Sequence, residues 1–165
     1  MTNYVCKIAK RDEIVKKCDY EIKNHPKDNN WKVFKEQALD NYDKKRIINY
    51  IGLLDNEIIC EATAVIDKSI VQNSDGLVDK ETVYLSGFRT NKEYQEQGYF
   101  SKLFKYMIKD LKKRNYKYAT LGVEACEVKN MIIYFKYGFI SFIKTALEEY
   151  PDGKVYTVNY YKKEL

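Results

Sequence analysis

The sequence predicts an α/β fold in which one mixed sheet of about seven strands carries helices on both faces. Strand-like and helix-like segments follow the order β-α-α-β-β-β-α-β-α-β-β, and such interleaving is typical of a sheet covered by helices. The 165 residues contain no internal repeat, low-complexity tract or linker. We therefore expect a single domain over residues 1–165, long enough to bury its own core.

The N-terminal third is predicted to hold a strand, two helices and a hairpin. The expected elements are a strand over 4–9, helices over 11–18 and 28–43, and strands over 46–54 and 57–66. Pro26 breaks regular structure between the helices, and Asp28 or Asn29 can cap the second one. Asp55-Asn56 is typical of a tight hairpin turn.

The central stretch, Glu81 to Asn115, is predicted to form a strand, a polar turn and a long helix. From Gly98 onward, apolar residues fall at 100, 103, 104, 107, 108 and 111, the spacing of one buried helix face. A glycine between strand and helix lets backbone N–H groups approach a ligand. Because a helix start attracts anions, this turn is a predicted anion site.

The C-terminal half is predicted to begin with a polar loop and to end in two strands. The expected elements are a loop or hairpin tip over 68–80, a strand over 116–123, a helix over 127–137, and strands over 139–144 and 155–161. Pro151-Asp152-Gly153 is a turn signal between the last two strands.

The composition argues against metal and membrane functions. The four cysteines at 6, 18, 60 and 126 lack zinc-ligand spacing, and His25 is the single histidine, so no metal site is expected. A cysteine nucleophile would need His25 nearby in space. No apolar run reaches membrane-spanning length and the first residues lack a signal-peptide core, so we expect a cytoplasmic protein with reduced thiols.

Two segments carry a resemblance to a known family. QEQGYF at 95–100 resembles the Q/R-x-x-G-x-G/A signature of the GNAT acyl-CoA N-acyltransferases. LGVEACEVKNMIIYFKYGF, from residue 121, is similar to that family's second signature and brings Asn130, Tyr134, Gly138 and Phe139 into register. The family's third signature position is usually Gly or Ala, and here it is Phe100, whose ring can point into the core.

The resemblance implies a mostly antiparallel sheet whose fourth and fifth strands splay apart around the pantetheine arm of acetyl-CoA. It implies that a set of residues from both signatures and the preceding strand holds this acyl donor. They are Phe88, Arg89, Thr90, Gln95, Glu96, Gln97, Gly98, Tyr99, Phe100, Ser101 and Asn130.

The net charge of +5 has two interpretations. Residues 92–117 contain eight Lys or Arg and three Asp or Glu, so this segment alone carries the excess. The simpler interpretation is a solvated outer face of the long helix, and the functional one is attraction for the phosphates of coenzyme A. The basic residues match no nucleic-acid reader motif, so nucleic acid is not an expected partner.

The resemblance also implies catalytic roles. Tyr134, four residues before Gly138, falls where the family places its general acid. Glu124 is the preferred general base, with Glu61 and Glu81 as alternatives. Strand alternation puts Glu124 on the same face as Gly122, where we expect the glycine to leave room for a ligand. The alternative role for Glu124 is structural, because its negative charge would interact favourably with the dipole at the start of the next helix.

The predicted function is therefore acetyl transfer from acetyl-CoA to an amine. The alternative is a non-catalytic acyl-CoA sensor with the same fold. Trp31, Phe34 and Tyr42 either line the acceptor site, as the resemblance implies, or pack in the core. The sequence leaves the acceptor and homodimer formation open.

Overall fold

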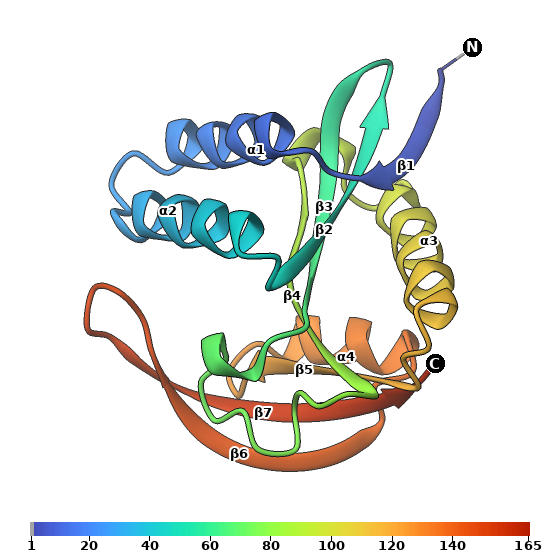
Figure 1. The fold of residues 1–165 in the computed structure, drawn as a ribbon. Coiled ribbons are helices and arrows are strands. Elements are labelled where there is room, and N and C mark those ends of the chain that lie inside the picture. Colours follow the sequence, from blue (N-terminus) through green and yellow to red (C-terminus); the bar gives the residue numbers. More distant parts are fainter. Residues whose placement is uncertain (1) are drawn as a thin grey trace. The chain divides into compact units, whose positions relative to one another are not determined.

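The computed structural model describes residues 2–165 and contains one seven-stranded sheet, in the order β1-β2-β3-β4-β5-β7-β6 (Figure 1). The chain divides into two compact units. The first unit comprises Met1–Thr63 and Gly87–Asp110, and the second comprises Ala64–Ser86 and Leu111–Leu165. Strands β3 and β4 and helix α3 each contribute residues to both units.

The observed elements follow the predicted order. They are β1 (Tyr4–Ile8), α1 (Arg11–Asn24), α2 (Asn30–Asp43), β2 (Ile47–Leu54), β3 (Glu57–Val65), η1 (Lys68–Ile70), β4 (Thr82–Thr90), η2 (Lys92–Tyr94), α3 (Tyr99–Lys113), β5 (Tyr118–Glu124), α4 (Val128–Lys136), β6 (Ser141–Glu149) and β7 (Val155–Glu164). No helix within residues 2–165 is long and apolar enough to cross a bilayer.

The sheet is mixed, as predicted. The pairs β1–β2, β5–β7 and β6–β7 are antiparallel, whereas β4 and β5 are parallel. The turn between β2 and β3 has positive φ at Asp55 (48°) and Asn56 (71°), which is the backbone of a type I′ hairpin. The predicted hairpin is therefore confirmed.

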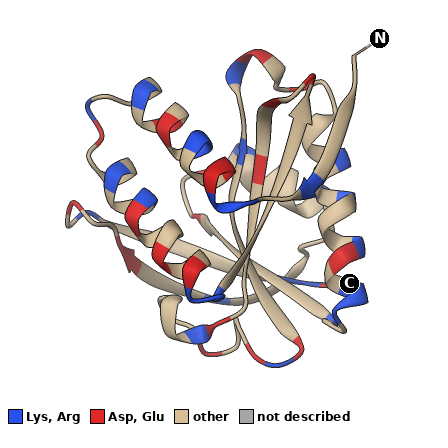
Figure 2. Ribbon diagram, turned by 45° about the horizontal axis from the view of Figure 1, so that its top comes forward, with Lys and Arg blue, Asp and Glu red and all other residues tan. Residues whose placement is uncertain are grey.

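In the first unit, helices cover both faces of the strands. Figures 1 and 2 show α1 and α2 on one side of β2 and β3 and α3 on the other. Ala9, Ile14 and Ile51 form a buried cluster there, and Tyr42 packs against it. Tyr42 is thus a core residue.

Helix α1 is longer than predicted. It continues past Cys18 to Asn24, and Lys17 and Glu21 are buried on it. Two charged residues at core positions hide the apolar spacing that would otherwise reveal a helix. The helix ends immediately before His25, so the predicted break is correct.

Helix α3 has the predicted buried face. Leu103, Phe104, Met107 and Leu111 are at most 5% exposed. The Lys residues of α3, at 102, 105, 109, 112 and 113, are all exposed, which fits a solvated outer face. Figure 2 shows the basic positions of this helix in blue.

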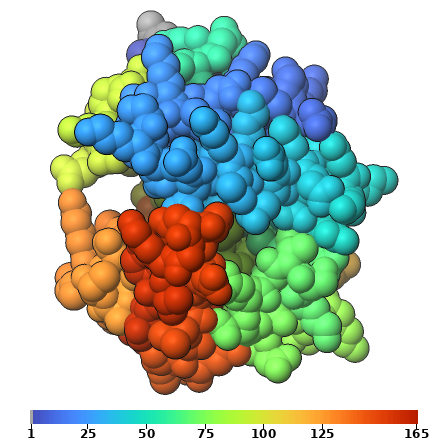
Figure 3. All heavy atoms as spheres, turned by 90° about the vertical axis from the view of Figure 1, so that its left-hand side faces the viewer, coloured from blue at the N-terminus to red at the C-terminus, as the bar shows by residue number. Residues whose placement is uncertain are grey.

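In the second unit, the loop that precedes β4 packs along β6 (Figure 3). The Gln72 side chain donates to the carbonyl of Glu149 and accepts from its N–H, both at 2.9 Å. Asn73 Nδ2 donates to the Leu147 carbonyl at 2.9 Å. These amides satisfy backbone groups of β6 and help to extend this strand beyond the predicted end at Lys144.

Candidate active site

The parallel pairing of β4 and β5 covers only part of each strand. Its register runs from Thr82↔Tyr118 to Leu85↔Leu121. Strand β4 then continues to Thr90 and β5 to Glu124. The register thus ends before either strand does, as expected for strands that splay apart.

The loop between β4 and α3 changes direction at Gly98. This residue has φ of +82°, and an added Cβ would meet nothing within 4 Å. Gln95, Glu96 and Gln97 are exposed beside it. The first N–H groups of a helix have no intrahelical acceptor, so the start of α3 can bind an anion through its backbone.

The side chains of this loop hold its own backbone. Gln95 Nε2 donates to the Thr90 carbonyl at 3.1 Å, and Gln97 Nε2 donates to the Glu93 carbonyl at 2.9 Å. Tyr4 fixes the helix start, because its hydroxyl donates to the Tyr99 carbonyl at 2.9 Å. Any ligand contact of Gln95 and Gln97 is therefore expected mainly from their main-chain groups.

Phe100 packs against the preceding strand. Its ring centroid lies 5.0 Å from that of Phe88, which in turn contacts Phe104 at 6.3 Å. The large residue at the third signature position thus points inward, as expected.

The side chain of Arg89 is turned toward α2 and β3. Its Nη1 donates to Glu61 Oε1 at 2.6 Å, and its guanidinium lies 4.6 Å from the Trp31 ring. The His25 ring also stacks on Trp31, with 5.0 Å between the ring centroids. Because the charge of Glu61 is already matched by Arg89, Glu61 is a poor candidate for the general base.

Tyr134 and Asn130 lie one turn apart on α4, in the second unit. Burial raises the pKa of the half-buried Tyr134 hydroxyl, and the negative charge of Glu127 raises it further. Like an ordinary tyrosine, Tyr134 is protonated at neutral pH and has a proton to donate. Asn130 Nδ2 donates to Glu127 Oε2 at 3.3 Å.

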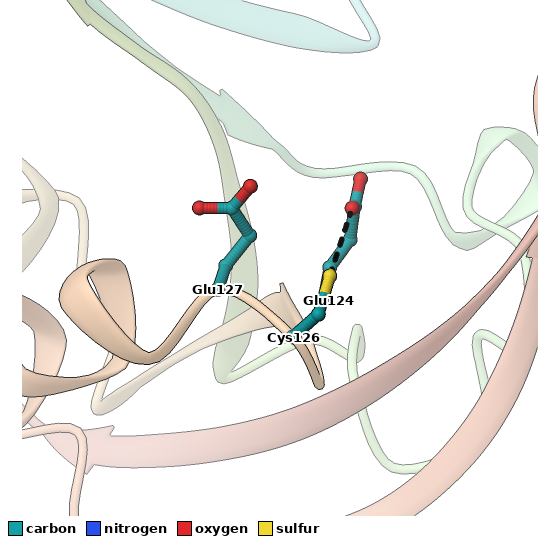
Figure 4. Close-up of side chains that lie close together, drawn as sticks. All are labelled: Glu124, Cys126 and Glu127. Atoms are coloured by element: carbon teal, nitrogen blue, oxygen red, sulfur yellow. Dashed lines mark hydrogen bonds between the residues drawn. The ribbon is translucent and has the colours of Figure 1, made fainter.

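Three potential metal ligands gather where β5 ends. Side-chain ligand atoms of Glu124, Cys126 and Glu127 lie within 4.8 Å of one another (Figure 4). Cys126 Sγ donates to Glu124 Oε2 at 3.9 Å, and Tyr150 donates to the other carboxylate oxygen. Exposed acidic groups often gather in this way without a metal, and we assign none here.

A family model of the acetyltransferase (GNAT) family matches residues 9–139. The chain belongs to the GNAT acetyltransferase family. Membership supports acyl transfer from acetyl-CoA as its general chemistry. No curated protein sequence matches the chain.

Solved structures of other acetyltransferases share this GNAT fold over nearly the whole chain. An IAA acetyltransferase from Bacillus cereus ATCC 14579 is 14% identical, with a TM-score of 0.70 and coverage of 99% of this chain and 100% of that one. The ribosomal-protein-S18-alanine N-acetyltransferase from Escherichia coli is 17% identical, with a TM-score of 0.65 and coverage of 98% and 94%.

A third similar structure contains the coenzyme. It is RimL, a ribosomal L7/L12 α-N-protein acetyltransferase in complex with coenzyme A, which forms a disulfide with a cysteine of that protein. It is 12% identical, with a TM-score of 0.73 and coverage of 98% of this chain and 94% of that one. At such low identities the similarity establishes the fold alone.

The expectation that Gly122 leaves room for a ligand in this GNAT protein is wrong. A Cβ at Gly122 would lie 2.7 Å from Val158 Cγ1, 2.9 Å from Tyr160 Cε1 and 3.0 Å from the Tyr84 hydroxyl oxygen. Side chains of neighbouring strands already fill that space. The alternation of side chains along β5 is otherwise as predicted, since Val123 is buried and Glu124 is partly exposed.

Glu81 is also poorly placed to act as the base of this GNAT protein. It precedes β4 and forms a 2.6 Å ion pair with Lys117, which precedes β5. Because β4 and β5 are parallel, Glu81 lies at their N-terminal ends and Glu124 at the C-terminal end of β5.

Sequence reasoning missed the tyrosines around Glu124. Tyr150 donates to Glu124 Oε1 at 3.0 Å, and its ring lies 4.6 Å from that of Tyr156. Burial and the bond to Glu124 raise the pKa of Tyr150. Neither tyrosine belongs to a family signature, and only the pairing of β5, β7 and β6 brings them near Glu124.

Proposed function

We propose that this GNAT protein transfers an acetyl group from acetyl-CoA to an amine, with Tyr134 as the general acid. The observation that carries the proposal is the position of Tyr134. It is half-buried on α4 and stands one helical turn after Asn130, in the segment that resembles the family's second signature.

The acyl donor is assigned to the turn before α3. The open, left-handed backbone at Gly98 and the N–H groups that begin α3 suit a pyrophosphate. The exposed lysines of α3 add positive charge that attracts such a ligand. In this proposal, main-chain groups of Phe88, Arg89 and Thr90 contact the pantetheine amides, and Asn130 contacts the same arm.

The proposed reaction is a direct transfer. The amine nitrogen forms a bond to the thioester carbonyl carbon, and main-chain N–H groups stabilise the negative charge on the carbonyl oxygen. The carbon–sulfur bond then breaks, and the leaving sulfur takes the proton of the Tyr134 hydroxyl. Tyr134 recovers a proton from solvent.

Glu124 is proposed to take the amine proton, directly or through water, or to attract a cationic acceptor. Its carboxylate is partly exposed and is oriented by the hydrogen bond from Tyr150. A negative charge at this position also favours an ammonium form of the acceptor.

Trp31 is proposed to contact the acceptor. Its indole Nε1 is buried and has no hydrogen-bond partner among the described residues. Because this N–H is buried, the proposed contact is made by the partly exposed indole ring and not by Nε1. Phe34 supports the indole edge-on, at 5.9 Å between ring centroids.

Both units are proposed to form one acyltransferase domain over residues 1–165. Two observations support a single domain. Strands β3 and β4 each have residues in both units, and the family match runs through both units. Cytoplasmic location and homodimer formation stay predictions.

The deciding experiment is turnover of acetyl-CoA across a panel of amines. It should include polyamines, amino acids, antibiotics and peptides with free N-termini or lysines. Coenzyme A should be measured by chromatography, because the exposed Cys126 would itself react with a thiol reagent. Release above the rate without protein supports the proposal, whereas acetyl-CoA binding without any turnover would favour a sensor.

A further inference from the structure

Lys17 and Glu21 form a buried ion pair on α1, in the first unit. Lys17 is 2% exposed and Glu21 is 6% exposed. Lys17 Nζ lies 2.6 Å from Glu21 Oε1 and 4.6 Å from the centre of the Tyr20 ring. Burying two charges is expensive, so this arrangement requires a reason beyond helix packing.

The same ammonium group reaches the loop that follows β4. Lys17 Nζ donates to Asn91 Oδ1 at 2.9 Å, and Asn91 is 3% exposed. The contact joins residues 74 positions apart in the chain. It therefore ties α1 to the first residue after β4.

Asn91 uses each of its other polar groups as well. Its side-chain Nδ2 donates to the Ile58 carbonyl at 3.3 Å, and its backbone N–H donates to the Ile59 carbonyl at 2.8 Å. Its carbonyl accepts from the Tyr94 N–H at 2.9 Å. Asn91 thus links β3, α1 and the turn η2 that leads to Gly98.

We propose that Lys17 is a positioning residue for acetyl-CoA binding, because it fixes the loop of residues 91–98 through Asn91. The inference rests on the proposed function, which assigns this loop to the pyrophosphate. Backbone donors bind an anion well only when they are held in place before the ligand arrives. Glu21 neutralises Lys17 and holds its ammonium group toward Asn91.

The energetics separate this role from simple stabilisation. Replacing a buried ion pair by apolar residues of similar volume is often neutral or stabilising for the fold. The same replacement leaves Asn91 Oδ1 without its charged donor and releases the loop. Stability and ligand affinity should therefore respond differently to the change.

The test is the double variant Lys17→Met/Glu21→Leu, compared with the unchanged protein for melting temperature and acetyl-CoA dissociation constant. Because the loop would no longer be held in place before the ligand arrives, we expect about tenfold weaker acetyl-CoA binding, which corresponds to about 1.4 kcal/mol. The melting temperature without ligand should fall only modestly, because the apolar pair offsets most of the cost of leaving Asn91 Oδ1 without its donor. KM for acetyl-CoA should rise more than kcat falls.

Two further variants make the test specific. Arg11→Met/Asp43→Leu removes an exposed ion pair that joins α1 to α2 and should leave affinity unchanged. Asn91→Ala keeps the ion pair and removes the acceptor. If Lys17 acts through Asn91, combining Asn91→Ala with the double variant should weaken binding no further than the stronger of the two alone.

The outcomes distinguish this inference from the proposed function. Failure of the unchanged protein to bind acetyl-CoA would overturn both. Binding by the unchanged protein together with equal binding by the double variant would overturn only the role of Lys17, as would fully additive losses with Asn91→Ala. If the double variant does not fold, full acetyl-CoA affinity in Asn91→Ala overturns the inference.

Discussion

The hydroxyl of Tyr150 donates a 3.0 Å hydrogen bond to Oε1 of Glu124. The bond joins the end of β6 to the end of β5 within the second unit. It holds the carboxylate of Glu124 in one orientation while leaving the side chain partly exposed. Such a placement suits the role proposed for Glu124 as a general base or as a binding site for a cationic amine.

We predict that Glu124→Gln lowers kcat/KM most at low pH. There the amine is protonated and needs a base, whereas at high pH it loses its proton to solvent and activity should partly recover. Rates should be measured against pH with an amine found in the panel. Tyr150→Phe, which keeps the ring beside Tyr156, serves as a control and should have a smaller effect of the same kind. If Glu124→Gln and the unchanged protein have identical pH profiles, Glu124 has no part in proton transfer.

We predict that Tyr134→Phe lowers kcat by about 10²-fold while acetyl-CoA affinity changes by less than a few-fold, as for loss of a positioned proton donor. Steady-state kinetics and calorimetry measure the two quantities. Tyr137 directly follows the same helix, α4. Tyr137→Phe is therefore the matched control and should keep most activity. Full activity in Tyr134→Phe would show that the departing thiolate needs no proton from Tyr134.

The pH dependence of kcat should reflect the raised pKa of Tyr134. The ordinary pKa of a tyrosine is about 10, and burial raises the pKa of Tyr134 above it. The acid form therefore persists to higher pH, so loss of the acid should begin only above the ordinary tyrosine range. A decline in kcat at neutral pH that Tyr134→Phe abolishes would contradict this assignment.

We predict that Gly98→Glu abolishes the rise in melting temperature caused by acetyl-CoA. A ligand that binds only the folded state stabilises it by mass action, and the new carboxylate would repel the pyrophosphate. Gly153→Glu is a matched control, because Gly153 also has positive φ (+83°) and open space around its Cβ position. Both variants should share the backbone strain, but only Gly98→Glu should lose the ligand response. An unchanged response in Gly98→Glu would mean that the phosphate loop is misassigned.

The cysteines should differ in reactivity. Cys126 is exposed, whereas burial raises the pKa of Cys18 to about 11 and also raises the pKa values of Cys6 and Cys60. A thiol reagent at neutral pH should therefore modify one cysteine quickly and the others only on unfolding. Mass spectrometry of Cys126→Ser checks the assignment, and fast labelling that survives this change would contradict it.

The sequence by itself determined the order of elements, the long helix α3 and the family. These features depend on local rules that a chain reports directly. The apolar spacing from residue 100 to 111 indicated a buried helix face. Asp55-Asn56 favoured a tight hairpin, and both residues have positive φ in the structure. The two signature segments indicated where acetyl-CoA and the general acid should be sought.

Only the tertiary structure decided what the charged and small residues do. Lys17 and Glu21 look like surface residues in the sequence, yet they are buried because Asn91, far along the chain, accepts a hydrogen bond from Lys17. Gly122 is explained by the side chains of β4 and β7 that occupy its face. The physical reason is the same in both cases, because a side chain's cost or benefit depends on partners that strand pairing and helix packing bring together, and no local pattern records them.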